Sequence, residues 1–247
     1  MNKYVNKTAF SCFLVFICMP ALIMCSAEEV DEEIASPEIL IVGGHDAHDF
    51  DRWFNEEDSK TLSEIGANVS YTDDPEAVLP QLPNLDILYL SNNQPLPDPE
   101  LHSSIHDFVE QGNGLLLVHA ATWYIWENDW PEYYRDFIGG GTRSHPPLGE
   151  FEVYVVDQGH PIMEGVPERF AIVDELYRFE RDEEGADMHV LAMGIEEETG
   201  EEYPVAWTVE YGNGQVVNIT LGHDGDAHQH EAYITMLQKS VNWLMQN

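Results

Sequence analysis

GLLLVH at residues 114–119 is the stretch of sequence that decides the fold. Its four consecutive apolar residues, with no polar residue between them, are typical of a strand buried on both faces of a parallel sheet. Two similar runs are also followed by a histidine: EILIVGG (38–44) precedes His48, and QVVNITLG (215–222) precedes His223. Ligand sites in open α/β sheets form outside the carboxyl ends of the strands. We therefore expect these three histidines to converge on one site.

Around these runs, strand and helix signals alternate through the first half of the chain, as in βαβ units. The expected strands there cover 38–42, 68–72, 85–91 and 115–118, and the expected helices cover 50–65 and 98–111. The second half has more strands, expected at 151–156, 170–173, 189–193, 205–210 and 216–221, and a closing helix at 230–245. Asn213-Gly214 marks a hairpin between the last two strands. The pattern predicts a flavodoxin-like three-layer α/β sandwich with a mostly parallel central sheet and an antiparallel extension.

The N-terminal segment has the composition of an export signal, with two lysines, an apolar run at 9–24, and Ser26-Ala27. We expect a signal peptide at 1–27, an acidic linker at 28–36 and one domain at 37–247. Cleavage after Ala27 would give a periplasmic or extracellular protein. The alternative is a lipid anchor on Cys25, in a sequence similar to a lipoprotein box. The apolar run is short for a spanning helix, so no transmembrane span is expected in the mature form.

Charge and cysteine content exclude several functions. The chain has 46 Asp and Glu against 10 Lys and Arg, for a formal net charge of -36. Nucleic acid is excluded as a partner, because binding phosphate backbones needs a basic face. All three cysteines, Cys12, Cys18 and Cys25, lie inside the export segment. The predicted domain therefore has neither disulfides nor a thiol nucleophile.

The chain resembles the ThuA-like domain family, which is related in fold to class I glutamine amidotransferases. The resemblance rests on the order and spacing of motifs at 114–123 (GLLLVHAATW), 138–145 (IGGGTRSH), 159–162 (GHPI), 174–177 (DELY), 204–216 (PVAWTVEYGNGQV) and 221–224 (LGHD). Amidotransferases place a cysteine nucleophile at the turn after the strand that corresponds to 115–118. This chain has His119-Ala120-Ala121 at that turn, so glutamine hydrolysis by the usual route is excluded.

The strand-end positions and the resemblance together indicate the site residues. We expect catalytic roles for His119, Glu175 and His223. We expect substrate contacts from His48, His145, Trp123 and Trp126. Neutral imidazoles of His48, His119 and His223, together with Glu175, could instead hold a divalent metal such as zinc, with one position left open. Each residue also has a structural alternative: a histidine buried against a backbone carbonyl, a surface carboxylate, or an aromatic lid packed on the sheet.

The resemblance implies carbohydrate processing, because ThuA-like proteins are associated with sugar utilisation. Our leading hypothesis is an exported hydrolase, lyase or isomerase that acts on a sugar or keto-sugar, with His119 and Glu175 exchanging protons with the substrate. The alternative is a non-catalytic carbohydrate-binding module. The glycines at 139–141 could admit a ligand to the backbone or form a loop after a helix, and we expect His228 at the site mouth or in solvent. The substrate, the cofactor and the oligomeric state are not defined by the sequence.

Overall fold

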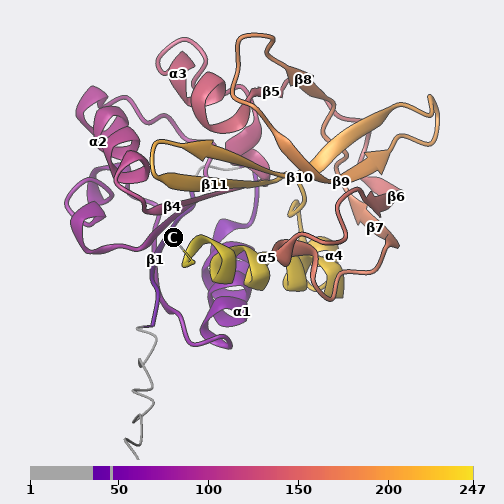
Figure 1. The fold of residues 1–247 in the computed structure, drawn as a ribbon, viewed down its shortest axis with the longest axis horizontal. Helices are drawn as coiled ribbons and strands as arrows, with labels where there is room; N and C mark the ends of the chain where they lie inside the picture. Colours follow the sequence, from indigo (N-terminus) through magenta and orange to yellow (C-terminus); the bar gives the residue numbers. More distant parts are fainter. Residues whose placement is uncertain (1–35, 45–46, 247) are drawn as a thin grey trace, which may run out of the picture. The chain divides into compact units, whose positions relative to one another are not determined.

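The structure is a computed structural model that describes residues 36–44 and 47–246 (Figure 1). The predicted signal peptide, the site of lipid attachment and all but the last residue of the predicted acidic linker lie outside the described residues. Within the part that is described, no helix combines the length and the apolar character needed to cross a membrane.

A nine-stranded sheet forms the centre of the domain. Its strands are β1 (Glu38–Val42), β2 (Asn68–Thr72), β3 (Ile87–Leu90), β4 (Gly114–Val118), β6 (Gly149–Val155), β7 (Arg169–Asp174), β9 (His189–Ile195), β10 (Glu202–Tyr211) and β11 (Gly214–Ile219). They lie in the order β2-β1-β3-β4-β11-β10-β9-β6-β7. Pairing is parallel from β2 to β11 and antiparallel from β11 to β7. The predicted parallel sheet with an antiparallel extension is thus confirmed.

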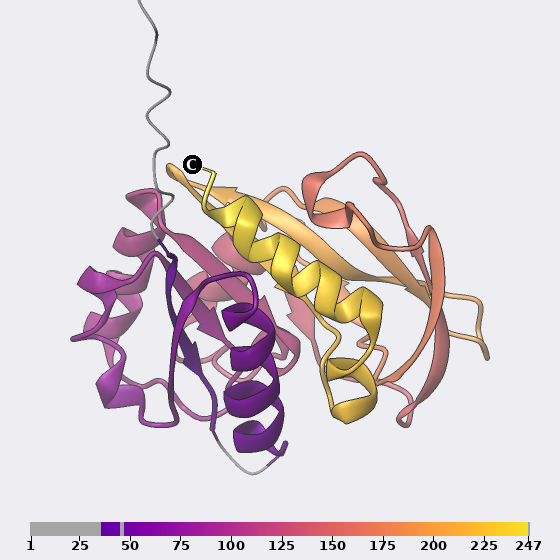
Figure 2. The ribbon, with the colours of Figure 1, turned by 90° about the horizontal axis from the view of Figure 1, so that it is seen from below.

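Helices cover both faces of this sheet, which gives the three layers. The main helical elements are η1 (Asp51–Asp58), α1 (Ser59–Ser63), α2 (Pro99–Glu110), α3 (Pro131–Tyr133), η5 (Tyr134–Ile138), α4 (Gly225–His228) and α5 (Glu231–Leu244). Short 3-10 turns occur at η2 (Pro75–Ala77), η3 (Leu82–Asn84), η4 (His119–Thr122) and η6 (Pro161–Met163). Figure 2 shows α5 lying along the sheet beside α1.

Alternation along the strands divides the core into two clusters. Ile39 and Ile41 of β1 pack with residues of η1, α1 and α5. Leu40 and Val42 point to the opposite face and pack with residues of α2, α3 and η5. Both faces of the central strands are therefore buried, which explains why their sequences are continuous apolar runs rather than alternating ones.

The predicted hairpin joins β10 to β11, with Gly212 and Asn213 as its two loop residues. Gly212 has φ 60°. A positive φ at the first loop position is typical of a type II′ turn, which favours glycine there. The turn was therefore predicted correctly, but the loop residues lie one position earlier than the Asn-Gly pair indicated.

The three glycines at 139–141 serve packing rather than ligand access. Gly139 ends η5 in the left-handed region at φ 79°. The next two belong to a short strand, β5 (Gly140–Thr142), which pairs with β8 (Phe179–Arg181) in a second sheet. A Cβ on Gly140 would lie 2.2 Å from the backbone oxygen of Glu180. The expected helix end is confirmed at Gly139, but the expected loop is a strand at 140–142. None of the three glycines lines the cavity described below.

Candidate functional site

His119 stands at the sharpest turn of the site, directly after β4. Its φ of 47° makes it the one non-glycine residue with a positive φ in the described part of the chain, and its side chain is fully buried. A non-glycine residue in this region stores strain, and such residues cluster at functional sites. The turn places the imidazole at the carboxyl end of β4, between the positions that follow β1 and β11.

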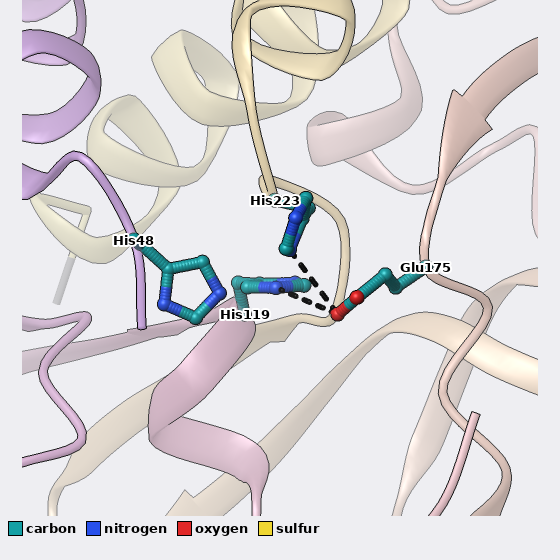
Figure 3. Close-up of side chains that lie close together, drawn as sticks. All are labelled: His48, His119, Glu175 and His223. Carbon is teal, nitrogen blue, oxygen red and sulfur yellow. Dashed lines mark ion pairs between the residues drawn. The ribbon is translucent and has the colours of Figure 1, made fainter. Parts of the chain in front are cut away.

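The three strand-end histidines and Glu175 lie together in one cluster (Figure 3). One possible ligand atom from each residue lies within 4.8 Å of the others. The ring centroid of His48 is 4.9 Å from that of His119 and 4.9 Å from that of His223. Glu175 Oε2 lies 3.1 Å from His223 Nδ1 and 3.7 Å from His119 Nε2. The predicted convergence of the three histidines is confirmed; the roles assigned to them stay predictions.

Asp174 explains how Glu175 reaches histidines that follow distant strands. It is the last residue of β7, at the far edge of the sheet, and its buried carboxylate accepts three backbone N–H groups. These belong to Glu175 (2.7 Å), Gly222 (2.8 Å) and His223 (3.2 Å). Burial raises the pKa of Asp174 to about 7, although the three donors oppose this effect. Asp174 therefore joins the end of β7 to the turn after β11, a role that our sequence reasoning missed.

The hydrogen bonds of His119 define its tautomer. Nδ1 lies 2.8 Å from the carbonyl oxygen of Thr220, which can only accept, so Nδ1 carries the proton. Nε2 is therefore unprotonated and carries a lone pair, which accepts a hydrogen bond from the hydroxyl of Tyr177 at 3.1 Å. Burial, with His48 as the next cause, holds the pKa of His119 well below its ordinary value. His119 is therefore neutral and directs Nε2 into the cluster.

Protonation differs between the other members of the cluster. Burial lowers the pKa of His48 to about 4, and its buried Nδ1 has no hydrogen-bond partner among the described residues. The contact with Glu175 raises the pKa of His223. Burial alone would raise the pKa of Glu175, but His223 and the other imidazoles lower it. The cluster thus combines two neutral imidazoles with an acid-base pair.

Three members of the cluster, His48, Glu175 and His223, line a cavity of about 340 Å³, and His119 is buried behind them. Trp123 and His145 line it, as expected for residues that contact a substrate. His145 Nδ1 lies 3.6 Å from Glu175 Oε1. Asn93, which follows β3, also lines the cavity, and its buried Oδ1 has no partner there. Our sequence reasoning did not identify Asn93 and Tyr177 as site residues. Asn93 could have been identified, because it is a polar residue that follows the apolar run 87–90.

Trp126 is not part of the cavity, so its prediction as a substrate-binding residue is wrong. Its side chain is 2% exposed, and its indole N–H donates to the carbonyl oxygen of Gln94. It packs against Trp130 and Tyr133 in the core on the α2 side of the sheet. This indole has its polar atom satisfied inside the protein, and no face is left for a sugar ring.

His228 is neither at the site mouth nor in solvent, which corrects both expectations for it. Its Nδ1 lies 2.7 Å from Oδ1 of the buried Asp58, and its Nε2 lies 3.0 Å from the carbonyl oxygen of Gly222. The other carboxylate oxygen of Asp58 accepts from the hydroxyls of Tyr89 and Tyr233. Since both partners of His228 are acceptors, the imidazole carries two protons. Burial alone would lower its pKa, but Asp58 raises it.

The donor set of the cluster fits a divalent transition metal. Imidazole nitrogen and carboxylate oxygen are ligands of zinc at about 2.0–2.2 Å, so tetrahedral ligand atoms lie about 3.3 Å apart. The four atoms here, within 4.8 Å of one another, would need to move closer to one another by up to about 1.5 Å. The bond from His119 Nδ1 to a carbonyl oxygen is the outer contact that orients a metal-binding histidine. Among residues 36–44 and 47–246, the buried Nδ1 of His48 has no hydrogen-bond partner, which is compatible with a ligand in the cluster.

Comparisons with known proteins identify a family and a shared fold. Residues 38–244 match the ThuA family, described as trehalose utilisation. No curated protein matches the chain. ThuA-like proteins of Parabacteroides merdae and Bacteroides uniformis have the same fold, with TM-scores of 0.72 and 0.71. Their sequences are 22% and 18% identical, over 85% of this chain in each case and 90% and 92% of theirs.

The fold also occurs inside a larger protein. A β-galactosidase from Bacillus circulans aligns over 85% of this chain and 30% of its own, at 11% identity and a TM-score of 0.54. At these identities the structural similarities establish a shared flavodoxin-like fold and nothing about the chemistry of the cluster.

Proposed function

The chain belongs to the ThuA family of trehalose utilisation, and on this premise we propose that it is a metal-dependent enzyme that acts on a carbohydrate. The observation that carries the proposal is the cluster of three imidazoles and one carboxylate beside a cavity, at the carboxyl ends of β1, β4, β7 and β11. With these four ligands the ion would bind a substrate oxygen from the cavity as a fifth ligand, and catalytic zinc sites can expand to five-coordinate in this way.

In this proposal His48, His119, His223 and Glu175 hold the ion. A divalent metal in such a position polarises a hydroxyl or carbonyl oxygen and lowers the pKa of water. Nδ1 of His119 is bound to the Thr220 carbonyl and its pKa is low, so Nε2 suits ligation better than proton exchange with a substrate. Proton transfer falls instead to His145, which lines the cavity and is partly open to solvent.

Substrate contacts in this proposal come from Trp123 and Asn93. The flat face of Trp123 suits stacking on a sugar ring, and rigid aromatic side chains lose little entropy on binding. The unpaired amide oxygen of Asn93 can accept a hydrogen bond from a sugar hydroxyl. No lysine or arginine of the described chain lines the cavity, so the substrate we propose is neutral. The export of the protein, through the segment 1–27, is part of the same proposal.

A second mechanism is favoured by one observation, the 3.1 Å contact between Glu175 and His223. Their pKa values shift apart, since that of Glu175 is lowered and that of His223 is raised. A pair of this kind can serve as base and acid without a metal.

The experiment that separates the two mechanisms starts from protein purified without chelator and supplied with zinc. Zinc content is measured by elemental analysis in the wild type, in Glu175→Gln and in the control His189→Gln. His189 is an exposed histidine that pairs with Asp157 outside the cluster. Turnover of glucosides and 3-keto glucosides is followed by NMR before and after chelation.

We expect one zinc per chain in the wild type and the control, loss of zinc in Glu175→Gln, and turnover that chelation abolishes. Turnover that survives chelation would favour the metal-free pair. Sugar binding measured by calorimetry, with no product from any sugar, would favour a binding module.

A further inference from the structure

The hydroxyl of Tyr177 donates a hydrogen bond to the nitrogen of His119 that would bind the proposed metal ion. Its hydroxyl lies 3.1 Å from His119 Nε2, and the side chain is almost fully buried while lining the cavity. Because Nδ1 of His119 donates its proton to Thr220, Nε2 can only accept, and the phenol must be the donor. A cation on Nε2 and this hydrogen bond are therefore mutually exclusive.

We propose that the Tyr177 hydroxyl has two hydrogen-bonding states. In the metal-free protein it donates to His119 Nε2. When a cation binds that nitrogen, the hydroxyl donates instead to an oxygen of a ligand in the cavity. This inference rests on the metal site of the proposed function. It assigns to Tyr177 a role in holding the ligand at the open side of the site, in addition to the residues placed there above.

Packing around the ring keeps the hydroxyl at this place. The ring of Tyr177 lies against His119 with centroids 4.6 Å apart, against Trp123 at 5.3 Å, and against His145 at 5.9 Å. With the ring held on these sides, release from Nε2 leaves the phenol free to rotate only its O–H bond. In the metal-bound state Glu175 and His223 hold the ion, and the Thr220 carbonyl still accepts from His119. The released donor therefore points to the cavity.

Removal of the Tyr177 hydroxyl should change the affinities for a cation and for an anion in opposite directions. In Tyr177→Phe a cation no longer has to displace a hydrogen bond from His119. Zn²⁺ should therefore bind about two- to tenfold more tightly, which corresponds to the free energy of one neutral hydrogen bond. An anion at the open side would lose a donor, so azide should bind to the Co²⁺-loaded variant about tenfold or more weakly, as for a hydrogen bond to a charged group. A tyrosine with a purely structural role would weaken both ligands when altered.

The experiment measures Zn²⁺ affinity by calorimetry and azide affinity from the visible spectrum of the Co²⁺-loaded protein. It compares wild type, Tyr177→Phe and the control Tyr154→Phe, which removes an exposed hydroxyl bound to Glu202 far from the cluster. We expect tighter Zn²⁺ and weaker azide in Tyr177→Phe, and wild-type values in the control. Equal or weaker Zn²⁺ binding in Tyr177→Phe, or unchanged azide binding, would overturn the inference. If no protein binds Zn²⁺, the proposed metal site itself fails, which is a separate result.

A measurement on the wild type keeps the inference testable if Tyr177→Phe does not fold. In metal-free protein labelled with ¹⁵N-histidine, His119 should show a protonated Nδ1 and a hydrogen-bonded, unprotonated Nε2. Added Zn²⁺ should shift the Nε2 resonance and leave Nδ1 protonated. A proton on Nε2 in the metal-free protein would contradict the arrangement from which the inference starts.

Discussion

Asp174→Asn should destabilise the fold and weaken zinc binding, although Asp174 is not a proposed ligand. The carboxylate accepts from Glu175 and His223 on Oδ1 and from Gly222 on Oδ2. An asparagine oxygen placed at Oδ1 keeps the first two bonds, but its NH₂ group then faces the N–H of Gly222. Two buried donors without acceptors cost about 2–6 kcal/mol, at about 1–3 kcal/mol each. For a domain of this size the loss corresponds to a decrease in melting temperature of about 4–24 °C.

The assay is urea unfolding and Zn²⁺ calorimetry at pH 8, above the pKa of about 7 of the wild-type carboxyl. Zn²⁺ affinity should decrease by about 10–100-fold, as for other outer contacts of metal ligands, because the turn that carries His223 loses the hydrogen bond from Gly222 to Asp174. Asp98→Asn is the matched control: Asp98 caps α2 through the N–H of Glu100, and asparagine caps a helix equally well. If Asp174→Asn is as stable as the control and binds Zn²⁺ as the wild type does, the carboxylate does not join the two strand ends as described.

Four further substitutions test the site and its surroundings. His119→Gln should lower Zn²⁺ affinity by more than about a hundredfold, beyond the effect of an outer contact, and calorimetry measures this directly. Trp126→Ala should cost about 3–5 kcal/mol in urea unfolding without altering Zn²⁺ affinity, because it empties a core position, whereas Trp123→Ala should weaken sugar binding at little cost in stability. The raised pKa of His228 means that its ion pair with Asp58 stabilises the fold fully below pH 6.5 and loses this contribution as the pH rises through the raised value. Unfolding free energies measured from pH 6 to 9 should therefore decrease in the wild type more than in His228→Gln, and parallel curves would contradict the assignment.

The sequence was sufficient to predict the sheet and the convergence of the histidines. Continuous apolar runs identify parallel strands, and the carboxyl ends of parallel strands lie at the same edge of a sheet. His48, His119 and His223 each follow such a run, so their proximity depends on the topology alone. The small sheet was missed because Gly140–Thr142 and Phe179–Arg181 are three residues long, too short for any periodicity.

Other parts of the site depend on contacts between distant segments, which no local pattern reveals. Glu175 follows an edge strand, and it reaches the histidines only because Asp174 binds backbone N–H groups almost 50 residues away. Trp123 and Trp126 are three residues apart in one aromatic segment, yet one lines the cavity and the other lies in the core. Inside the core, the carbonyl of Gln94 accepts the indole N–H of Trp126, a contact between separate segments that no local pattern reveals.

The central claim, that three imidazoles and a carboxylate hold one cation, is tested most directly by a crystal structure of the zinc-supplied protein with anomalous scattering measured at the zinc edge. The account predicts one anomalous peak at about 2.0–2.2 Å from one atom each of His48, His119, His223 and Glu175. It also predicts that the Tyr177 hydroxyl no longer contacts His119 Nε2. A zinc-soaked crystal with no peak at the cluster, and with Glu175 still paired to His223, would contradict it.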